Sequence, residues 1–332
     1  MHEHLAALPE SLREKLKRKT QPDFISPMKA TLVHEHFSDP GWIYERKLDG
    51  ERSLLHKKGR KVTLYSRNEK KKNETYPEIA EAVGRLEGNF ILDAEIVAFD
   101  RKRTSFKRLQ RRMHVKHPDE TLLKEVPVYV YAFDLLFYGG YDLTALPQEE
   151  RKKLLRSLFD AEDPFRLLPH RREKGEAYLK EACEKGWEGL IAKDAGAAYV
   201  HKRSKKWLKF KCGNRQEMVI AGYTDPEGGR LGFGALLLGF YRDDKLIYAG
   251  RVGTGFDDDF LKSFHAELKK LERKTSPFAD YDPEDSSIHW VRPEYVGEIG
   301  FTEWTRENRL RHPRFLGLRE DKEASSVVKE GA

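Results

Sequence analysis

One lysine of this chain stands in a setting that suits a nucleophile. Lys47 lies in the run ERKLDGER (45–52), on an apparent strand just before a glycine turn and among fixed charges. An ordinary lysine has a pKa near 10.4, so roughly one in a thousand is unprotonated at neutral pH. Desolvation and cationic neighbours raise that fraction. Lys47 is therefore a candidate for covalent attack on an electrophile.

A second basic segment, residues 207–211, supplies cationic neighbours. If the segment is a strand, Lys209 and Lys211 share one face about 7 Å apart, whereas Leu208 and Phe210 lie on the other face. The lysine face suits a phosphate group, and the apolar face suits a protein core.

Short segments of this kind follow one another along nearly the whole chain. In order they are KLDGER (47–52), YSRN (65–68), LDAEIV (92–97), YAFDLL (131–136), EGLIAKD (188–194), WLKFK (207–211) and LREDK (318–322). Together they resemble the ATP-dependent DNA ligases of the covalent nucleotidyltransferase superfamily, above all the ligase module of bacterial end-joining ligase D and its stand-alone relatives. The resemblance spans residues 24–325.

The resemblance implies how the first group transfer would occur. Lys47 would attack the α-phosphate of ATP, release pyrophosphate and carry AMP on its side-chain nitrogen. Lys209 and Lys211 would hold the α-phosphate and stabilise its developing negative charge. Glu45 shares a strand face with Lys47 and would accept the exocyclic amine of adenine. Because guanine presents a carbonyl there, ATP is favoured over GTP.

Further residues receive nucleotide roles from the same resemblance. Phe133 would stack on the purine, and Arg52 and Glu95 would engage a phosphate or the ribose. Arg67 would grip the 5′-phosphate of a nick, because an arginine fork binds two oxygens at once. The family more often has glycine at the position of Ala94, which is a minor departure.

A metal ion and a second phosphate contact are also implied. Glu188, together with Glu95, would bind a divalent metal, and Lys193 would bind a phosphate. The expected ion is Mg²⁺ (or Mn²⁺), which bridges nucleotide phosphates through one or two carboxylates and keeps most of its waters. No dedicated cage of ligands is therefore expected in the sequence.

The last motif lies near the end of the chain. The family's counterparts of Arg311, Arg319, Asp321 and Lys322 close over ATP and orient the leaving pyrophosphate. The resemblance thus implies a moving second domain that acts in the first transfer and clasps DNA in the later ones.

Composition bounds the fold and the partners. The chain has 332 residues, 62 Lys and Arg against 55 Asp and Glu, and a net charge of +7, which allows two domains and favours a polyanionic partner. With no zinc-type spacing, Cys183 and Cys212 are expected to be reduced thiols. No apolar run is long enough for a membrane span, so a soluble cytoplasmic protein, nucleoid-associated when it acts on DNA, is expected.

Local patterns predict an α+β adenylation (nucleotidyltransferase) domain at 24–212 and a small OB-fold β-barrel domain at 213–332, after a basic arm or docking helix at 1–23. The resemblance, rather than periodicity, decides for the OB type. Strands are predicted at 42–47, 52–57, 62–66, 90–99, 128–137, 217–224, 234–242, 246–253, 295–303 and 314–318, and helices at 76–87, 104–113, 148–160, 174–186 and 256–273.

We therefore predict an ATP-dependent DNA ligase that seals nicks between a 3′-hydroxyl and a 5′-phosphate in duplex DNA, as a monomer, in DNA repair. The resemblance makes a Ku-type end-joining partner plausible, although no sequence motif indicates it. Two alternatives stay open. One is an RNA ligase or an RNA-capping guanylyltransferase, although Glu45 argues against GTP. The other is a non-catalytic nucleic-acid-binding scaffold, supported only by the basic charge.

Overall fold

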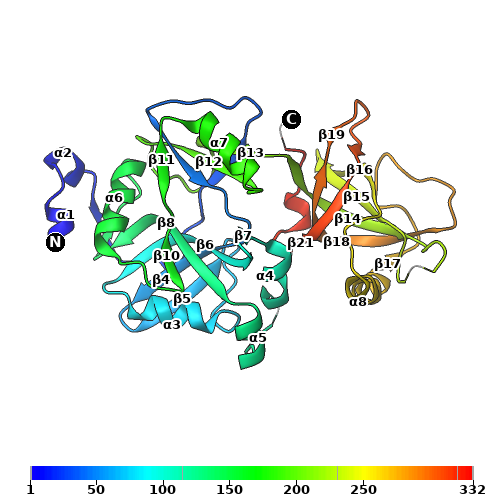
Figure 1. The fold of residues 1–332 in the computed structure, drawn as a ribbon, viewed down its shortest axis with the longest axis horizontal. Helices are drawn as coiled ribbons and strands as arrows, with labels where there is room; N and C mark the ends of the chain where they lie inside the picture. Colours follow the sequence, from blue (N-terminus) through cyan, green and yellow to red (C-terminus); the bar gives the residue numbers. More distant parts are fainter. Residues whose placement is uncertain (1, 114, 230, 320, 331–332) are drawn as a thin grey trace. The chain divides into compact units, whose positions relative to one another are not determined.

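The computed structural model describes residues 2–113, 115–229, 231–319 and 321–330. The chain divides into two compact units, the first ending at Cys212 and the second beginning at Gly213 (Figure 1). Each unit has its own hydrophobic core. No helix in the described ranges combines the length and apolar character needed to cross a bilayer.

The first unit is built around a large, mostly antiparallel sheet. Its neighbouring strands run in the order β1-β9-β8-β6-β4-β5, with β10 parallel to β8 and the short β7 paired with β6. β6 and β8 are buried along most of their length, as their long apolar runs predict. The strands are β1 (Lys17–Arg18), β4 (Glu51–Lys58), β5 (Lys61–Ser66), β6 (Phe90–Asp100), β7 (Arg103–Thr104), β8 (Val128–Tyr138), β9 (Tyr141–Asp142) and β10 (Phe165–Leu167).

A second sheet in this unit carries the segments with the lysines. Its order is β11-β3-β12-β13-β2, so β3 and β12 are central neighbours. Apolar side chains from both sheets form one core cluster, including Leu54 and Ile91 from the first sheet and Trp207 from the second. The strands are β2 (Lys29–Leu32), β3 (Trp42–Arg46), β11 (His170–Arg172), β12 (Gly189–Asp194) and β13 (Arg203–Lys211).

Helices cover the remaining faces of the two sheets. α3 (Pro77–Arg85), α4 (Phe106–Met113) and α6 (Gln148–Leu158) pack on the large sheet, and α7 (Gly175–Glu184) packs on the second sheet (Figure 1). All four helices are confirmed with somewhat shorter bounds than predicted. The short α5 (Glu120–Glu125) was missed because six residues give no clear periodicity; the side chain of Asp119 caps it.

The first residues of the chain fold onto the same unit. They form α1 (Glu3–Ala6), α2 (Glu10–Arg13) and β1, which pairs with β9. Leu5 and Leu8 enter the core, and Leu12 and Leu16 pack against it, as their spacing predicts. The helix is split in two because Pro9 begins α2 and cannot donate a backbone hydrogen bond to α1.

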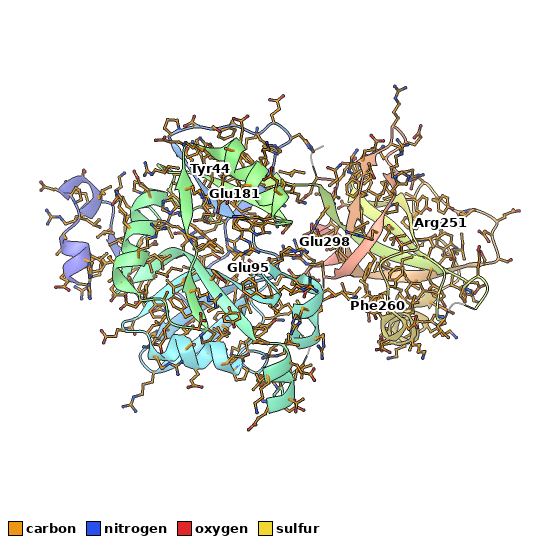
Figure 2. The ribbon with its side chains drawn as sticks, in the orientation of Figure 1. Tyr44, Glu95, Glu181, Arg251, Phe260 and Glu298 are labelled. Atoms are coloured by element: carbon orange, nitrogen blue, oxygen red, sulfur yellow. A yellow bond between two sulfur atoms is a disulfide. The ribbon has the colours of Figure 1, made fainter. Side chains whose placement is uncertain are left out.

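The second unit is a curled antiparallel sheet with one long helix. Its order is β16-β15-β14-β18-β17, with β21 paired to β18 and β19 paired to β20. Phe260 of α8 (Figure 2) stacks on Phe264 with ring centroids 4.9 Å apart and packs against the core of this unit. The elements are β14 (Asn214–Thr224), β15 (Leu236–Arg242), β16 (Lys245–Val252), α8 (Asp258–Lys269), β17 (Glu272–Arg273), β18 (Ile288–Phe301), β19 (Glu303–Trp304), β20 (Leu310–Arg311), β21 (Arg314–Leu318) and the 3₁₀ turn η1 (Ala324–Ser326).

The strand predicted at 295–303 starts seven residues earlier, so its predicted start was wrong. β18 starts at Ile288 and passes through Pro293. Its pairing with β14 skips from Trp290 to Tyr295, so the residues between them bulge away from β14. A proline is tolerated in a strand at such a bulge, where no ladder hydrogen bond is lost.

The prediction of two reduced thiols was also wrong. Cys183 of α7 and Cys212, just after β13, form a disulfide with their Cα atoms 5.2 Å apart. The packing of α7 on the second sheet brings the two residues together. Two cysteines 29 residues apart carry no sequence signal of that packing.

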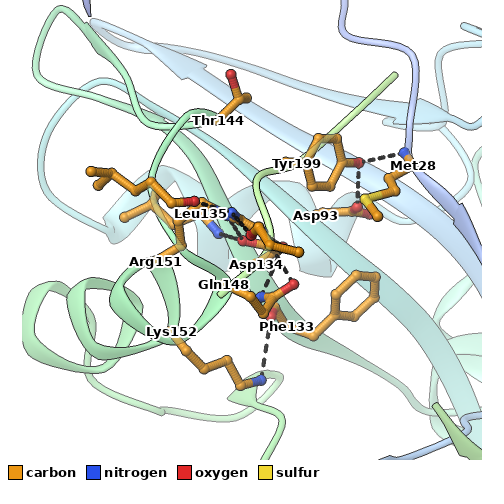
Figure 3. A network of polar contacts seen from close by, with 12 residues as sticks. Met28, Asp93, Phe133, Asp134, Leu135, Thr144, Gln148, Arg151, Lys152 and Tyr199 are labelled. Atoms are coloured by element: carbon orange, nitrogen blue, oxygen red, sulfur yellow. Dashed lines mark hydrogen bonds and ion pairs between the residues drawn. The ribbon is translucent and has the colours of Figure 1, made fainter. Parts of the chain in front are cut away.

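α6 is anchored by a buried ion pair. Arg151 donates from Nε to Oδ1 of Asp134 at 2.7 Å and from Nη2 to Oδ2 at 2.9 Å (Figure 3). Both side chains are fully buried. Burial raises the pKa of the Asp134 carboxyl, but Arg151, Lys193 and Gln148 together hold it below its ordinary value. The pair therefore stabilises the fold as long as Asp134 is ionised.

Replacing Arg151 with methionine is expected to destabilise the first unit by about 3 kcal/mol at pH 7, because it leaves the Asp134 charge buried without its partner. The free energy of unfolding in urea measures this. Lys153→Met is the matched control, since the Lys153 side chain is 65% exposed.

The pH dependence of this loss has a definite sign. The folded pKa of Asp134 is depressed, so its stabilisation is present above the unfolded pKa, about 3.9, and is lost as the pH falls further. Protonation also relieves the unpaired charge in Arg151→Met. The difference between parent and variant should therefore shrink from pH 7 to pH 4; a constant difference would contradict the ionic origin.

Candidate active site

Lys47 lies immediately after the end of β3. Its backbone nitrogen donates to the carbonyl of Gly189 at 2.9 Å, and its Nζ lies 2.5 Å from Oε1 of Glu188. The Glu188 side chain is nearly buried. The glycine turn predicted after Lys47 is required sterically, because a Cβ on Gly50 would lie 2.2 Å from the carbonyl oxygen of Ile96.

Glu188 reaches Lys47 because β3 and β12 are antiparallel neighbours, with Arg46 in register with Leu190. β12 and β13 also approach closely at this point. Gly189 has a φ of 144°, and a Cβ there would lie 2.0 Å from the carbonyl oxygen of Phe210. The register pairs Gly189 with Lys211, so the end of β13 lies directly beside the Glu188 segment. The fold thus brings together the lysine and the acidic residue of two motifs that are far apart in the sequence.

The two faces of β13 differ as the alternation predicts. Leu208 and Phe210 are buried in the core beneath α7. Lys209 and Lys211 are half-buried and point to the opposite face, with Lys209 paired in register with Ile191 of β12. The predicted division into a lysine face and a core face is confirmed.

Glu45 is a buried carboxylate held by two lysines. Its Oε2 lies 2.7 Å from Nζ of Lys193, and its Oε1 contacts Nζ of Lys152. All three side chains are at most 2% exposed. Burial alone would raise the pKa of Glu45, but the two ammonium groups lower it by more, so the pKa lies below its ordinary value. Glu45 is therefore ionised at neutral pH.

Arg52 is fixed by a second buried carboxylate that sequence reasoning missed. Its Nε lies 2.8 Å from Oδ1 of Asp93 and its Nη2 lies 2.5 Å from Oδ2. Tyr199 donates to Asp93 Oδ2 at 2.7 Å and accepts from the backbone nitrogen of Met28 at 2.9 Å (Figure 3). Burial alone would lower the pKa of Arg52, but the Asp93 carboxylate raises it by more. The pKa of Arg52 therefore lies above its ordinary value.

Two aromatic rings lie next to both the Glu45–lysine group and Arg52. The rings of Phe133 and Trp207 meet edge to face with centroids 6.2 Å apart. Nζ of Lys193 lies 4.4 Å from the Phe133 centroid and 4.1 Å from that of Trp207. The guanidinium of Arg52 lies 5.4 Å from the Phe133 centroid. Phe133 therefore stands among the cations that the sequence assigned to the nucleotide.

Comparison with known proteins gives this arrangement a family. A model described as the ATP dependent DNA ligase domain matches residues 26–211, and one described as the ATP dependent DNA ligase C terminal region matches residues 229–322. The chain belongs to the ATP-dependent DNA ligase family. The predicted nucleotidyltransferase and OB-fold architecture is thereby confirmed.

Individual relatives agree with the family assignment. The chain is 39% identical over 318 residues to the multifunctional non-homologous end joining protein LigD of Pseudomonas aeruginosa, covering 93% of this chain and 37% of that protein. It is 35% identical over 323 residues to LigD of Mycobacterium tuberculosis, covering 93% of this chain and 40% of that one. The chain thus spans about two fifths of the length of these curated relatives.

A solved ligase structure matches over nearly the whole chain. Mycobacterial DNA ligase D complexed with ATP is 32% identical, with a TM-score of 0.69, and the match covers 94% of this chain and 100% of that one. That similarity includes both units.

The other ligase-motif residues of the first unit lie on neighbouring elements. Glu95 lies on β6 in register with Arg52 of β4 (Figure 2). Arg67 lies in the turn that follows β5. The roles predicted for these two residues remain predictions.

The last ligase motif forms a charged cluster within the second unit. Arg319 binds Asp321 through two hydrogen bonds of 2.9 and 3.0 Å and lies 3.2 Å from Oε2 of Glu298. Lys322 lies 2.5 Å from Oε1 of Glu217. Glu320 falls outside the described residues. Arg311 is not part of this cluster: it is exposed on β20 and pairs with Glu303.

The carboxylate of Glu188, near Lys47, suits a metal ion that takes its other ligands from phosphates and water. The described residues contain no group of three or more His, Cys, Asp or Glu that could hold a metal alone. Glu188 is a nearly buried carboxylate at the Lys47 ammonium. One or two carboxylates are what Mg²⁺ requires when nucleotide phosphates supply further oxygens, so the donor set fits this ion.

Lys152, Asp93 and Tyr199 are the main site residues that the sequence did not reveal. Lys152 did leave one signal: with Gln148 and Arg151 it shares the face of α6 that carries the buried Leu155. Polar residues on the apolar stripe of a helix need buried partners. Asp93 and Tyr199 left no comparable signal, because 106 residues separate them.

Replacing Tyr199 with phenylalanine should destabilise the first unit by about 1–3 kcal/mol. It leaves Oδ2 of Asp93 and the amide of Met28 with one partner fewer. Urea unfolding measures the loss, and Tyr131→Phe is the control because its hydroxyl binds the partly exposed Arg166. A Tyr199→Phe protein as stable as this control would show that Asp93 does not depend on the hydroxyl.

Proposed function

We propose that this protein is an ATP-dependent DNA ligase that seals 3′-hydroxyl and 5′-phosphate nicks in duplex DNA through a lysyl-AMP intermediate. The observation that carries the proposal is the contact between Lys47 and the nearly buried Glu188, beside the lysine face of β13. Membership of the DNA ligase family supports it over an RNA-capping enzyme or a non-catalytic scaffold.

In the first transfer, the Lys47 amine forms a bond to the α-phosphorus of ATP and the bond to the β-phosphate oxygen breaks. Pyrophosphate leaves with that electron pair. The proton that the attacking nitrogen gives up passes to solvent, and the positive field of Lys209 and Lys211 favours its loss. Lys209 and Lys211 hold the α-phosphate and stabilise the charge that develops on it.

The base and ribose would be held by the groups around Phe133. In this proposal Phe133 stacks on adenine, Glu45 accepts its exocyclic amine, and Arg52 with Glu95 engages the ribose or a phosphate. Lys193 lies between Glu45 and the aromatic rings. Its contribution to phosphate binding would therefore act from within the buried network.

Glu188, with Glu95, would hold Mg²⁺ or Mn²⁺, which when bound neutralises charge on the nucleotide phosphates. The protein's own residues then complete the reaction. AMP moves from Lys47 to the 5′-phosphate of the nick, which Arg67 grips, and the 3′-hydroxyl attacks that phosphate and expels AMP.

The proposed division of labour follows the two units. Residues 24–212 would form the adenylation domain, and residues 213–332 the OB domain that brings Arg311, Arg319, Asp321 and Lys322 to ATP. We further propose a role in DNA repair by end joining, in the cytoplasm at the nucleoid, with a Ku-type partner. Similarity to proteins named for non-homologous end joining is the support for that role.

Lys47→Ala should abolish labelling of the protein by α-labelled ATP and the sealing of ordinary nicks. Sealing of a pre-adenylated nick should persist, because the last transfer does not need the lysine. A denaturing gel and a ligation assay measure the two activities. Full labelling of the variant would contradict the assignment of the nucleophile.

Lys322→Ala should reduce self-adenylation by about tenfold or more while leaving the sealing of a pre-adenylated nick within about twofold of the parent, because a lost charged contact to phosphate costs on the order of 1.5–3 kcal/mol. Lys329→Ala in the same unit is the control, since Lys329 pairs with Asn308. Equal losses in both activities of a normally stable variant would contradict a motif that acts only on ATP.

A further inference from the structure

α6 has a polar face that is buried. Gln148 and Arg151 are 0% exposed and Lys152 is 1% exposed, although all three are residues that normally reach water. Arg151 holds Asp134 (Figure 3). Gln148 accepts a hydrogen bond from Trp207 Nε1 at 2.9 Å. Lys152 belongs to the same face but contacts Glu45. The reaction described above gives Lys152 no role.

The ammonium group of Lys152 lies among three oxygen atoms. It contacts Oε1 of Glu45, lies 2.9 Å from the carbonyl oxygen of Leu168, and lies 3.3 Å from the carbonyl oxygen of Phe133. The two contacts with backbone carbonyls are hydrogen bonds, and the contact with Glu45 is an ion pair. This is a built arrangement rather than a lysine that folds inward by chance.

Two of the three acceptors, Glu45 and Phe133, belong to the part of the site that would meet the base. Glu45 lies two residues before Lys47 on β3. The carbonyl of Phe133 belongs to the residue whose ring meets Trp207. Lys152 therefore links the carboxylate expected to bind the adenine amine to the backbone beneath the ring expected to stack on adenine.

Lys193 alone does not supply this link. It binds the other carboxylate oxygen of Glu45, but its ammonium also lies over the rings of Phe133 and Trp207. Without Lys152, Glu45 would keep one counter-ion in a fully buried position, and two carbonyl oxygens would lose a donor. A buried carboxylate with half its charge partners is free to protonate or to turn.

We infer that Lys152 is a positioning residue for base selection: it holds the Glu45 carboxylate in the orientation that distinguishes the amine of adenine from a carbonyl, and it fixes Phe133 against that edge. This inference rests on the proposed function, because it needs Glu45 at the purine. It adds to that function a residue of α6 that acts through Glu45 rather than by touching the nucleotide.

Binding measurements without catalysis test the inference directly. ATP and inosine triphosphate differ at the purine position that Glu45 would contact, where inosine has a carbonyl. Their dissociation constants are measured by calorimetry in EDTA for the parent, Lys152→Met, Lys152→Arg and Lys153→Met. Lys153 is the neighbouring lysine on the exposed face of α6, so its variant makes the same chemical change without touching Glu45.

The parent should prefer ATP by at least about tenfold, since a carbonyl against a carboxylate costs on the order of 1–3 kcal/mol. Lys152→Met should lose most of that preference by binding ATP more weakly, with inosine triphosphate binding nearly unchanged. Lys152→Arg should regain at least part of it, and Lys153→Met should match the parent.

A double variant guards against a purely structural effect. Glu45→Gln alone should remove the preference, and Glu45→Gln with Lys152→Met should be no worse, because the two residues act as one unit. A Lys152→Met protein that weakens the binding of both nucleotides equally would overturn the inference, as would an unchanged preference or a parent without one. If Lys152→Met does not fold, Lys152→Gln is measured against the same criteria.

The ligase proposal fails separately. A parent that is never labelled by ATP in Mg²⁺, yet binds ATP in preference to inosine triphosphate through Lys152, would contradict the ligase reaction while supporting the positioning role.

Discussion

The buried carboxylate of Glu45 is the constraint on which the first unit's site depends. A lone ionised carboxylate in the interior costs several kcal/mol, and here two lysines from different elements offset that cost. Lys152 ties Glu45 to α6 and Lys193 ties it to β12. Because Lys47 follows Glu45 by two residues, the same contacts fix where the chain leaves β3 at Lys47. There the lysine lies beside Glu188, which directly precedes β12.

Much of the fold could be predicted from local patterns, and its departures have local causes. Strands β6 and β8 could be predicted from their long apolar runs, and β13 from its alternation of apolar and basic residues. The start of β18 was missed because Pro293 is unusual in a strand. The bulge that accommodates it depends on pairing with β14, which the local sequence does not indicate. The Cys183–Cys212 disulfide was missed for the same reason: it depends on where α7 packs.

The residues of the site also fall into two groups, those that could be predicted from local sequence and those that depend on tertiary packing. Residues that lie in recognisable motifs, such as Lys47, Glu188 and the lysines of β13, could be assigned by resemblance, because each sits at a strand end or turn. The residues that hold them could not. Asp93 binds Arg52 from a strand 41 residues away, and Lys152 meets Glu45 from a helix that reads as an ordinary amphipathic segment. Partners of buried charges come from tertiary packing and must be read from the structure.

The central claim is that this buried charge network presents Lys47, and no other lysine, to the α-phosphate of ATP. Mass spectrometry of peptides from the parent protein, after incubation with ATP and Mg²⁺, tests it most directly. The account predicts AMP on the peptide that contains Lys47 and fragment ions that place it on that side chain. AMP on Lys209 or Lys211, or no AMP-modified peptide at all, would contradict it.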